Sequence, residues 1–298
     1  MIPDRRKRSL VSDTVSNGKV ERPKSILVVD DDPAICKLLT TLLAGPDREI
    51  ESSSNGLEAL ARVRARPYDL IVTDVRMPGI DGLELLRQIR QIRPEVKVVV
   101  MTADNTPRNI LQAIRDHAFS FFSKPFATET VAETVAQALE SGSAEDDIVV
   151  LSARPEWIAL RLRCKIETAD RLLHFLRELR MDLPESERDT IATAFREILM
   201  NAIEHGGRSD PGQKVYVTCV RTSRAIVYYV RDPGAGFSME TLPHAAISNP
   251  PESPTEHLDY RTEHGIRPGG FGILLVRNMV DELIYNEKGN EVVLIKYV

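Results

Sequence analysis

The feature that most constrains the fold is an alternation, in the first half of the chain, between short apolar runs and amphipathic segments. The runs at 25–29, 69–74, 96–102 and 119–123 have the length of strands, and 49–54 is a weaker strand candidate; each is followed by residues with helical spacing. Because parallel strands need helical crossovers, five such units predict an α/β fold, a doubly wound five-stranded parallel sheet.

The second half of the chain follows a different order of elements. A strand near 157–163 precedes two consecutive helices, and two adjacent strands follow at 214–220 and 225–230. A long loop rich in Gly, Pro and His then leads to a helix beginning near Phe271 and to a closing hairpin with Lys-Gly-Asn at its turn. Neighbouring antiparallel strands combined with helices predict an α+β sandwich with its helices on one face.

The length of 298 residues is enough for two domains of ordinary size. We expect a mobile polar tail at 1–23, a first domain at 24–141, a small acidic linker at 142–148 and a second domain at 149–298. The basic run Arg5–Arg8 belongs to the tail, where we expect it to be solvated.

Charge and composition argue against several classes of function. A net charge of −5 and a pI of about 5.8 are unlike a nucleic-acid-binding surface, which needs a basic stripe. No apolar stretch has membrane-spanning length, and residues 1–24 lack a signal-peptide core. Three scattered cysteines, Cys36, Cys164 and Cys219, predict a reducing cytoplasm and neither a disulfide nor a zinc framework.

Polar side chains gather at the carboxyl ends of the predicted parallel strands, where functional groups meet in such sheets. They are Asp30, Asp31 and Asp32 after the first strand, Asp74 after the third, Thr102 after the fourth and Lys124 after the fifth. Oxygen ligands of this kind can hold Mg²⁺, and the cation together with Lys124 would balance the carboxylates. Asp32 stands before Pro33 and fits a helix N-cap better than a metal ligand.

The motifs "VVDDDP", "DLIVTDVRMPGIDG", "VVVMTA" and "FFSKPF" appear in an order and spacing that resemble the receiver domain of two-component response regulators, over about 24–141. The resemblance implies a flavodoxin-like fold, and it implies that Asp74 accepts a phosphoryl group. It implies that Asp30 and Asp31 hold Mg²⁺ together with Asp74 and the backbone carbonyl of Arg76. The same resemblance places Thr102 and Lys124 on the phosphoryl oxygens.

Three details accompany this resemblance. The Lys124–Pro125 bond is expected to be cis, an arrangement almost confined to proline. Phe121 stands where the family keeps an aromatic switch residue, and it lacks the hydroxyl of the common Tyr. His117-Ala118 replaces the usual Gly-Ala.

A second set of motifs lies in the second half. Glu197, Asn201 and His205 are spaced i, i+4, i+8 and form a polar stripe on a helix whose other face is apolar. An apolar strand ends at Asp232 and runs into Gly234 and Gly236, and "GGFG", with Gly270 and Gly272, opens a later helix. Glycines at a helix N-terminus let phosphates approach backbone N–H groups.

Together these motifs resemble the GHKL-type ATP-binding domain shared by histidine kinases, gyrase-type ATPases and anti-sigma-factor serine kinases, over about 150–298. The resemblance implies that Asn201 reaches Mg²⁺, Asp232 binds the adenine amino group and Glu197 is the general base. It implies that the four glycines of the two motifs line the nucleotide. A lid is expected at about 237–268, and its candidate phosphate contacts are Arg267, His244, His257 and His264. For each histidine, the alternative is a place in a solvated loop.

Within that superfamily the match is closest to the anti-sigma-factor serine kinases, because two helices follow "RPEWIALRLRC" directly and the ending "GGFGILLVRNMVDEL" is compact. An atypical histidine kinase is the alternative, and His174 is its only candidate phosphoacceptor. His174 lies too close to Asn201 to leave room for the second long helix of a dimerisation domain, so we expect a helix-surface or hydrogen-bonded histidine.

The combined resemblances predict a cytoplasmic response regulator. Phosphorylation of Asp74 by a histidine kinase or phosphotransfer protein would control an ATP- and Mg²⁺-dependent serine kinase. Its expected target is a STAS-type anti-sigma-factor antagonist, with a sigma factor as a further partner and a homodimer as one assembly. The alternative is a non-catalytic module that sequesters a sigma factor or antagonist; intact Glu197 and Asn201 favour the enzyme. We expect no direct contact with nucleic acid or membrane.

Overall fold

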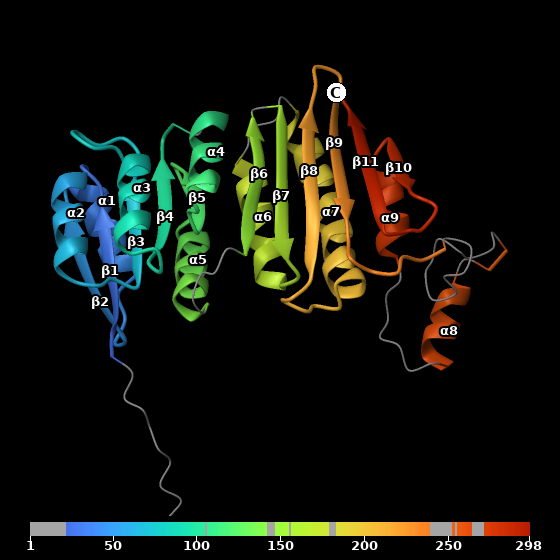
Figure 1. Ribbon diagram of the computed structural model, residues 1–298, viewed down its shortest axis with the longest axis horizontal. Helices are drawn as coiled ribbons and strands as arrows, with labels where there is room; N and C mark the ends of the chain where they lie inside the picture. Colours follow the sequence, from blue (N-terminus) through green and yellow to red (C-terminus); the bar gives the residue numbers. More distant parts are fainter. Residues whose placement is uncertain are drawn as a thin grey trace, which may run out of the picture.

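The computed structural model describes residues 22–104, 106–141, 147–154, 156–178, 183–238, 252–253, 255–263 and 271–298. Two sheets lie side by side, and helices pack against each of them (Figure 1). The basic run of the predicted tail and most of the predicted linker lie outside the described residues.

The first sheet is parallel throughout and has the strand order β2-β1-β3-β4-β5. Its strands are β1 (Lys24–Val29), β2 (Arg48–Ser53), β3 (Leu70–Asp74), β4 (Lys97–Thr102) and β5 (Ser120–Ser123). Its helices are α1 (Pro33–Leu42), α2 (Gly56–Ala65), α3 (Gly82–Ile92), α4 (Pro107–Arg115) and α5 (Thr128–Glu140). Buried residues of α1 and α5 pack on one face of the sheet, and those of α2, α3 and α4 contribute to the core on the other. The predicted doubly wound sheet is therefore confirmed.

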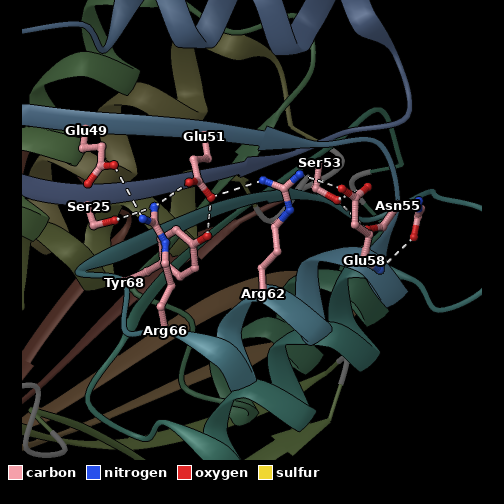
Figure 2. A network of polar contacts seen from close by, with 9 residues as sticks. All are labelled: Ser25, Glu49, Glu51, Ser53, Asn55, Glu58, Arg62, Arg66 and Tyr68. Carbon is pink, nitrogen blue, oxygen red and sulfur yellow. Dashed lines mark hydrogen bonds and ion pairs between the residues drawn. The ribbon is translucent and has the colours of Figure 1, made fainter.

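The edge strand β2 carries acids in place of an alternating apolar pattern, and a polar network fixes it to α2 (Figure 2). Arg62 of α2 bonds Glu51 at 3.2 Å and Glu58 at 2.6 Å, and Arg66 pairs with Glu51 at 2.9 Å. The Tyr68 hydroxyl donates to Glu51 at 2.6 Å, and this hydrogen bond is the largest of the effects that lower the pKa of Glu51. The network compensates for the weak strand signal of this segment.

The second sheet is antiparallel, in the order β10-β11-β9-β8-β7-β6. Its strands are β6 (Ile148–Arg154), β7 (Trp157–Arg163), β8 (Lys214–Arg221), β9 (Ala225–Arg231), β10 (Glu282–Tyr285) and β11 (Glu291–Tyr297). β6 is absent from the predicted elements, and β10 begins inside the segment predicted as the last helix. The α+β arrangement itself is as predicted.

Helices α6 (Ile166–Glu178), α7 (Glu185–Asn201) and α9 (Gly272–Met279) lie on one face of this sheet (Figure 1). A π-helical turn, η1 (Ala202–Gly206), continues α7. A further helix, α8 (Glu256–Glu263), lies within the stretch predicted as a lid loop.

The two halves of the chain meet where α6 packs against β5, the free edge of the first sheet. Arg171 Nε of α6 donates to the Phe119 carbonyl at 3.1 Å, and its guanidinium lies 4.4 Å from the centre of the Phe119 ring. His174 Nε2 bonds the Phe121 carbonyl at 2.8 Å, and because a carbonyl only accepts, Nε2 carries the proton. One cluster of buried apolar residues runs from the first sheet into the second.

Candidate functional sites

The carboxyl end of the first sheet holds a lysine bridged between two buried carboxylates. Asp30 and Asp74 are 1% and 4% exposed, and Thr102 beside them is fully buried. Lys124 Nζ lies 2.7 Å from Asp30 Oδ2 and 2.6 Å from Asp74 Oδ1. The structure thus brings together residues from the ends of β1, β3, β4 and β5, as the strand pattern predicts.

Burial affects the ionisation of Asp74 and Lys124. It raises the pKa of Asp74, and the nearby Asp30 charge adds to the rise, so that the hydrogen bond from Lys124 does not offset it. For Lys124, burial opposes the charged form, but the two carboxylates prevail and the pKa is raised. A second cation near Asp74 would relieve the carboxylate repulsion.

The loop after β3 is built around Asp74. The backbone N–H of Arg76 donates to Asp74 Oδ2 at 2.6 Å. Gly82, at the start of α3, packs so closely that an added Cβ would lie 1.9 Å from the Asp74 carbonyl oxygen. Gly82 is therefore a positioning residue that the sequence motif contains but does not single out.

The other predicted residues contact the neighbouring loops. Asp32 caps α1 by accepting from the Ala34 N–H at 2.7 Å, which confirms the N-cap prediction. Thr102 Oγ1 accepts from the Asp104 N–H at 3.0 Å, and Arg76 pairs with Asp104 at 2.7 Å. Asp104 therefore joins the loops after β3 and β4, a contact that the strand-end pattern does not reveal.

The donor set fits Mg²⁺ in its chemistry, because Asp30 and Asp74 present buried carboxylate oxygens and Lys124 supplies only one positive charge. Asp31 is exposed beside them. Within the described parts of the chain, no group of three or more His, Cys, Asp or Glu side chains is arranged to hold a metal ion. The assignment of Asp30, Asp31, Asp74 and the Arg76 carbonyl as ligands therefore remains a prediction.

Three predicted details of this domain appear in the backbone and its packing. The Lys124–Pro125 bond is cis, as expected. Phe121 is fully buried at the β5 edge. His117, which replaces a glycine, has a φ of 60°, in the left-handed region where glycine is favoured.

A cavity of about 670 Å³ lies against the second sheet and receives the polar stripe of α7 and η1. It is lined by Glu197, Asn201, His205, Gly206, Arg208, Asp232, Gly234, Gly236, Gly272, Gly289 and Asn290, among others. Ile198, Ala202, Val230 and Val292 give it apolar walls. The helix and the first glycine motif therefore converge on one space, with Gly272 of the second motif.

Gly206 and Asp232 form the tightest part of this cavity. A Cβ at Gly206 would lie 2.3 Å from the Asp232 Cγ, so only glycine lets the end of η1 lie against this carboxylate. The Gly234 N–H donates to Asp232 Oδ1 at 2.7 Å. Burial raises the pKa of Asp232. Gly206 and the Gly234 N–H thus hold the Asp232 carboxylate in place from two sides.

The second glycine motif reaches the helix stripe through Gly272. A Cβ there would lie 3.1 Å from Glu197 Oε2 and 3.8 Å from Asn201 Nδ2. Helix α9 begins at Gly272 without a side-chain cap. Its first N–H groups can therefore bind an anion close to Glu197 and Asn201.

The far wall of the cavity depends on two further glycines in the left-handed region. Gly236 has a φ of 82°, and a Cβ would lie 1.8 Å from the Lys288 carbonyl oxygen. Gly289 has a φ of 76° and packs in the same way against the Phe237 carbonyl. Rings of Phe237 and Tyr285 meet edge to face at 5.2 Å. The closing hairpin therefore forms part of the site, which its turn sequence alone did not indicate.

Several predicted residues lie outside the described part of the chain. They are Gly270, Arg267, His244 and His264. The side chain of His257, on α8, is also outside it.

His174 does not face this cavity. Its ring bonds the Phe121 carbonyl and lies 4.5 Å from the Phe122 ring. The expectation of a hydrogen-bonded histidine fits this position.

Comparisons with known proteins identify a family for each half of the chain. The response regulator receiver domain family matches residues 26–136, and the histidine kinase-like ATPase domain family matches residues 162–296. The chain joins a receiver domain to a histidine kinase-like ATPase domain. The receiver domain implies a phosphodonor such as a histidine kinase, and the ATPase domain implies ATP binding.

Curated relatives include the transcriptional regulatory protein ZraR of Klebsiella oxytoca, 36% identical over 114 residues, which are 38% of this chain and 26% of that protein. The DNA-binding transcriptional regulator NtrC of Azospirillum brasilense is 38% identical over 119 residues, which are 40% of this chain and 25% of that protein. The chain therefore spans about a quarter of the length of these relatives.

Solved structures include the response regulator protein TrrA of Thermotoga maritima in complex with Mg²⁺-BeF. It is 37% identical, with a TM-score of 0.36, and the match covers 39% of this chain and 99% of that one. The receiver domain of an HD domain-containing protein from Pseudomonas fluorescens is 28% identical, with a TM-score of 0.39, and the match covers 40% of this chain and 96% of that one.

The remaining expectations concern thiols and membranes. The three cysteines are free, and burial raises the pKa of Cys164 to about 11 and that of Cys219 to about 12. In the described ranges, no helix has both the length and the apolar character needed to span a bilayer.

Proposed function

We propose that the chain is a response regulator whose phosphorylation on Asp74 controls an ATP-dependent protein serine kinase. The single observation that supports the kinase is the position of Glu197 and Asn201 beside Gly272 at the start of α9. A carboxylate next to N–H groups that can bind phosphate provides a base and a phosphate site in one place.

In the receiver domain, an Asp74 carboxylate oxygen attacks the phosphorus of the phosphodonor, and the donor's imidazole leaves with the electron pair of the broken P–N bond. Lys124 and Thr102 orient the phosphoryl oxygens. Asp30 and Asp31, with Asp74 and the Arg76 carbonyl, would hold Mg²⁺, which neutralises charge on the phosphoryl group.

In the ATPase domain, Asp232 binds the adenine amino group and the glycines let the phosphates approach the backbone. Asn201 would hold Mg²⁺. Glu197 accepts the proton of a substrate serine as the hydroxyl oxygen attacks the γ-phosphorus, and ADP leaves. The proposed substrate is an anti-sigma-factor antagonist of the STAS type, and a sigma factor is a second proposed partner.

Labelled ATP and candidate antagonists test the kinase. We expect a serine phosphate on the antagonist, and Glu197→Ala should retain nucleotide binding while transfer falls by about 10²–10⁴. Asn201→Ala should weaken Mg·ATP binding in calorimetry. ATP binding with stable antagonist or sigma-factor capture but no transfer would instead identify a non-catalytic sequestering module.

A small-molecule phosphodonor tests the receiver separately. Wild-type protein should acquire an acid-labile, hydroxylamine-sensitive label, and Asp74→Asn should not. Label that persists in Asp74→Asn would reject this assignment, whatever the outcome for the kinase.

A further inference from the structure

The polar stripe of α7 and η1 contains a third residue, His205, to which the proposed reaction gives no role. Glu197, Asn201 and His205 are spaced four residues apart, and all three line the cavity of the ATPase domain. Glu197 and Asn201 serve as base and Mg²⁺ ligand in the proposed function. The place of His205 along the cavity indicates what its ring contacts.

The two ends of this cavity differ in chemistry. At one end, a Cβ on Gly272 would lie 3.1 Å from Glu197 Oε2 and 3.8 Å from Asn201 Nδ2. The first N–H groups of α9, which can bind phosphate, therefore lie beside these two side chains. At the other end, Gly206 lies against Asp232, the proposed partner of the adenine amino group. The helix thus runs from the phosphate end of the site to the base end.

The spacing along the helix places the sugar. Gly206 follows Asn201 by five residues, which is about 7 Å at the rise of an α-helix. The ribose joins the base covalently to the phosphates, so it lies against the stretch between these two residues. His205, directly before Gly206, is the member of the polar stripe in that stretch.

The π-helical turn η1 directs this side chain toward the ligand. The turn is closed by a hydrogen bond of 2.8 Å from the Gly207 N–H to the Ala202 carbonyl, five residues earlier. In an α-helix, a residue four positions on is rotated about 40° past a full turn, and a wider turn reduces this rotation. His205 therefore stays closer to the line of Asn201. Turns of this kind are frequent at functional sites.

The chemistry of His205 suits a sugar hydroxyl. The residue is exposed where it lines the cavity, so a ligand can reach its ring. A neutral imidazole has one donor and one acceptor nitrogen, and a hydroxyl group both donates and accepts. The ring and the hydroxyl therefore match in either tautomer.

We propose that His205 binds a ribose hydroxyl of the nucleotide, so that the site prefers ribonucleotides to their deoxy analogues. This inference rests on the proposed ATP binding: Asn201 and Asp232 hold the two ends of the nucleotide, and the sugar between them meets His205. A favourable charge at the C-terminus of the helix is the alternative role of this histidine, and that role would not distinguish between sugars.

Calorimetry on the full chain with Mg²⁺ compares ADP with 2′-deoxy-ADP and 3′-deoxy-ADP, which keep the base and the phosphates. We expect ADP to bind about three to ten times more tightly than at least one deoxy analogue, because one hydrogen bond is lost. The analogue that binds more weakly shows which hydroxyl the ring contacts.

His205→Leu should bind ADP about three to ten times more weakly than wild type does and should lose the preference for ADP over that analogue. His205→Gln keeps a hydrogen-bonding group and should retain part of the preference. Glu204→Gln is the matched control, because Glu204 is the neighbouring exposed residue of η1 and is not part of the cavity lining. This control should keep the affinity and the preference of wild type.

Equal affinity of wild type for all three ligands, or an unchanged preference in His205→Leu, would overturn the inference and leave nucleotide binding in place. No binding of any of the three to wild type would contradict the proposed function as well. Because the comparison of ligands uses wild-type protein, its outcome does not depend on the folding of a variant.

Discussion

The residues that the sequence predicts best are those whose position follows from strand order alone. Asp30, Asp74 and Lys124 meet because the carboxyl ends of parallel strands share one edge. Gly82 could not be identified in this way, since its importance comes from the approach of the Asp74 backbone.

Gly82→Ala tests whether this single glycine positions Asp74. The new methyl group would lie 1.9 Å from the Asp74 carbonyl oxygen, so α3 or the β3 end must move. We expect a loss of about 1–3 kcal/mol in the free energy of unfolding, together with slower labelling by a phosphodonor. Denaturant unfolding and labelling kinetics measure the two effects.

Gly45→Ala is the matched control, because a Cβ there meets only the side chains of Asp47 and Arg48, at 3.0 Å and beyond. Equal stability and labelling in the two variants would show that the β3–α3 contact does not position Asp74.

At the scale of elements, the missed strand and the shortened helix have different causes. β6 begins with a continuous apolar run at 148–151, but only its first residue is buried, and the run directly follows the acidic segment interpreted as a linker. The segment after Met279 could continue a helix, but pairing of Glu282 with Ile295 on β11 makes it a strand. Tertiary pairing decided the second case, and local propensity could not.

The π-helical turn η1 is the element that brings α7 to Asp232. In Gly206→Ala the methyl group would overlap the Asp232 carboxylate, which the hydrogen bond from the Gly234 N–H holds in place. We expect ATP affinity to fall by about tenfold or more, corresponding to at least about 1.4 kcal/mol. Gly212→Ala, whose Cβ would meet only the Asp210 side chain at 3.2 Å, should bind ATP as wild type does. Calorimetry that gives both variants wild-type affinity would exclude this role for η1.

Helix α6 is the element that closes the free edge of the receiver sheet. In the double variant Arg171→Ala/His174→Ala, the carbonyls of Phe119 and Phe121 lose these two donors. An unpaired buried carbonyl costs about 1–3 kcal/mol. We therefore expect a lower unfolding temperature and faster amide exchange in β5.

Arg177→Ala, on the exposed side of α6, should leave both measurements unchanged. If the double variant also keeps wild-type exchange in β5, these side chains do not hold the interface. Retained ATP-dependent transfer in His174→Ala would agree with a structural role for this histidine and exclude it as a phosphoacceptor.

At the scale of the whole molecule, one chain of contacts joins the two sites. Lys124 follows β5. The carbonyls of Phe121 in β5 and of Phe119 just before it bond side chains of α6, and α6 packs on α7, which carries Glu197 and Asn201. The apolar cluster that spans both sheets makes the domains one packed unit rather than two bodies on a free linker. Sequence patterns show each domain but not the contacts that join them, because Arg171 and His174 look like ordinary polar residues of a helix surface.

The docked arrangement predicts how the receiver controls its neighbour. A phosphoryl group on Asp74 adds about −1.5 to −2 charges beside Lys124 and Thr102. Any rearrangement of β5 that follows must alter the hydrogen bonds to α6 and, through α6, the position of α7. A tenfold change in output requires only about 1.4 kcal/mol of difference between the two arrangements, which is similar to the cost of one of these buried hydrogen bonds.

Beryllofluoride with Mg²⁺, which mimics the acyl phosphate, should therefore change transfer to the antagonist, or binding of it, by several-fold in the full chain. Asp74→Asn should not respond, because the mimic has no carboxylate to occupy. Arg171→Ala/His174→Ala should still be phosphorylated at Asp74 but should respond less, since its link between β5 and α6 is broken. An equal response in wild type and the double variant would place the coupling elsewhere, and no response in wild type would mean that the receiver acts on a separate partner.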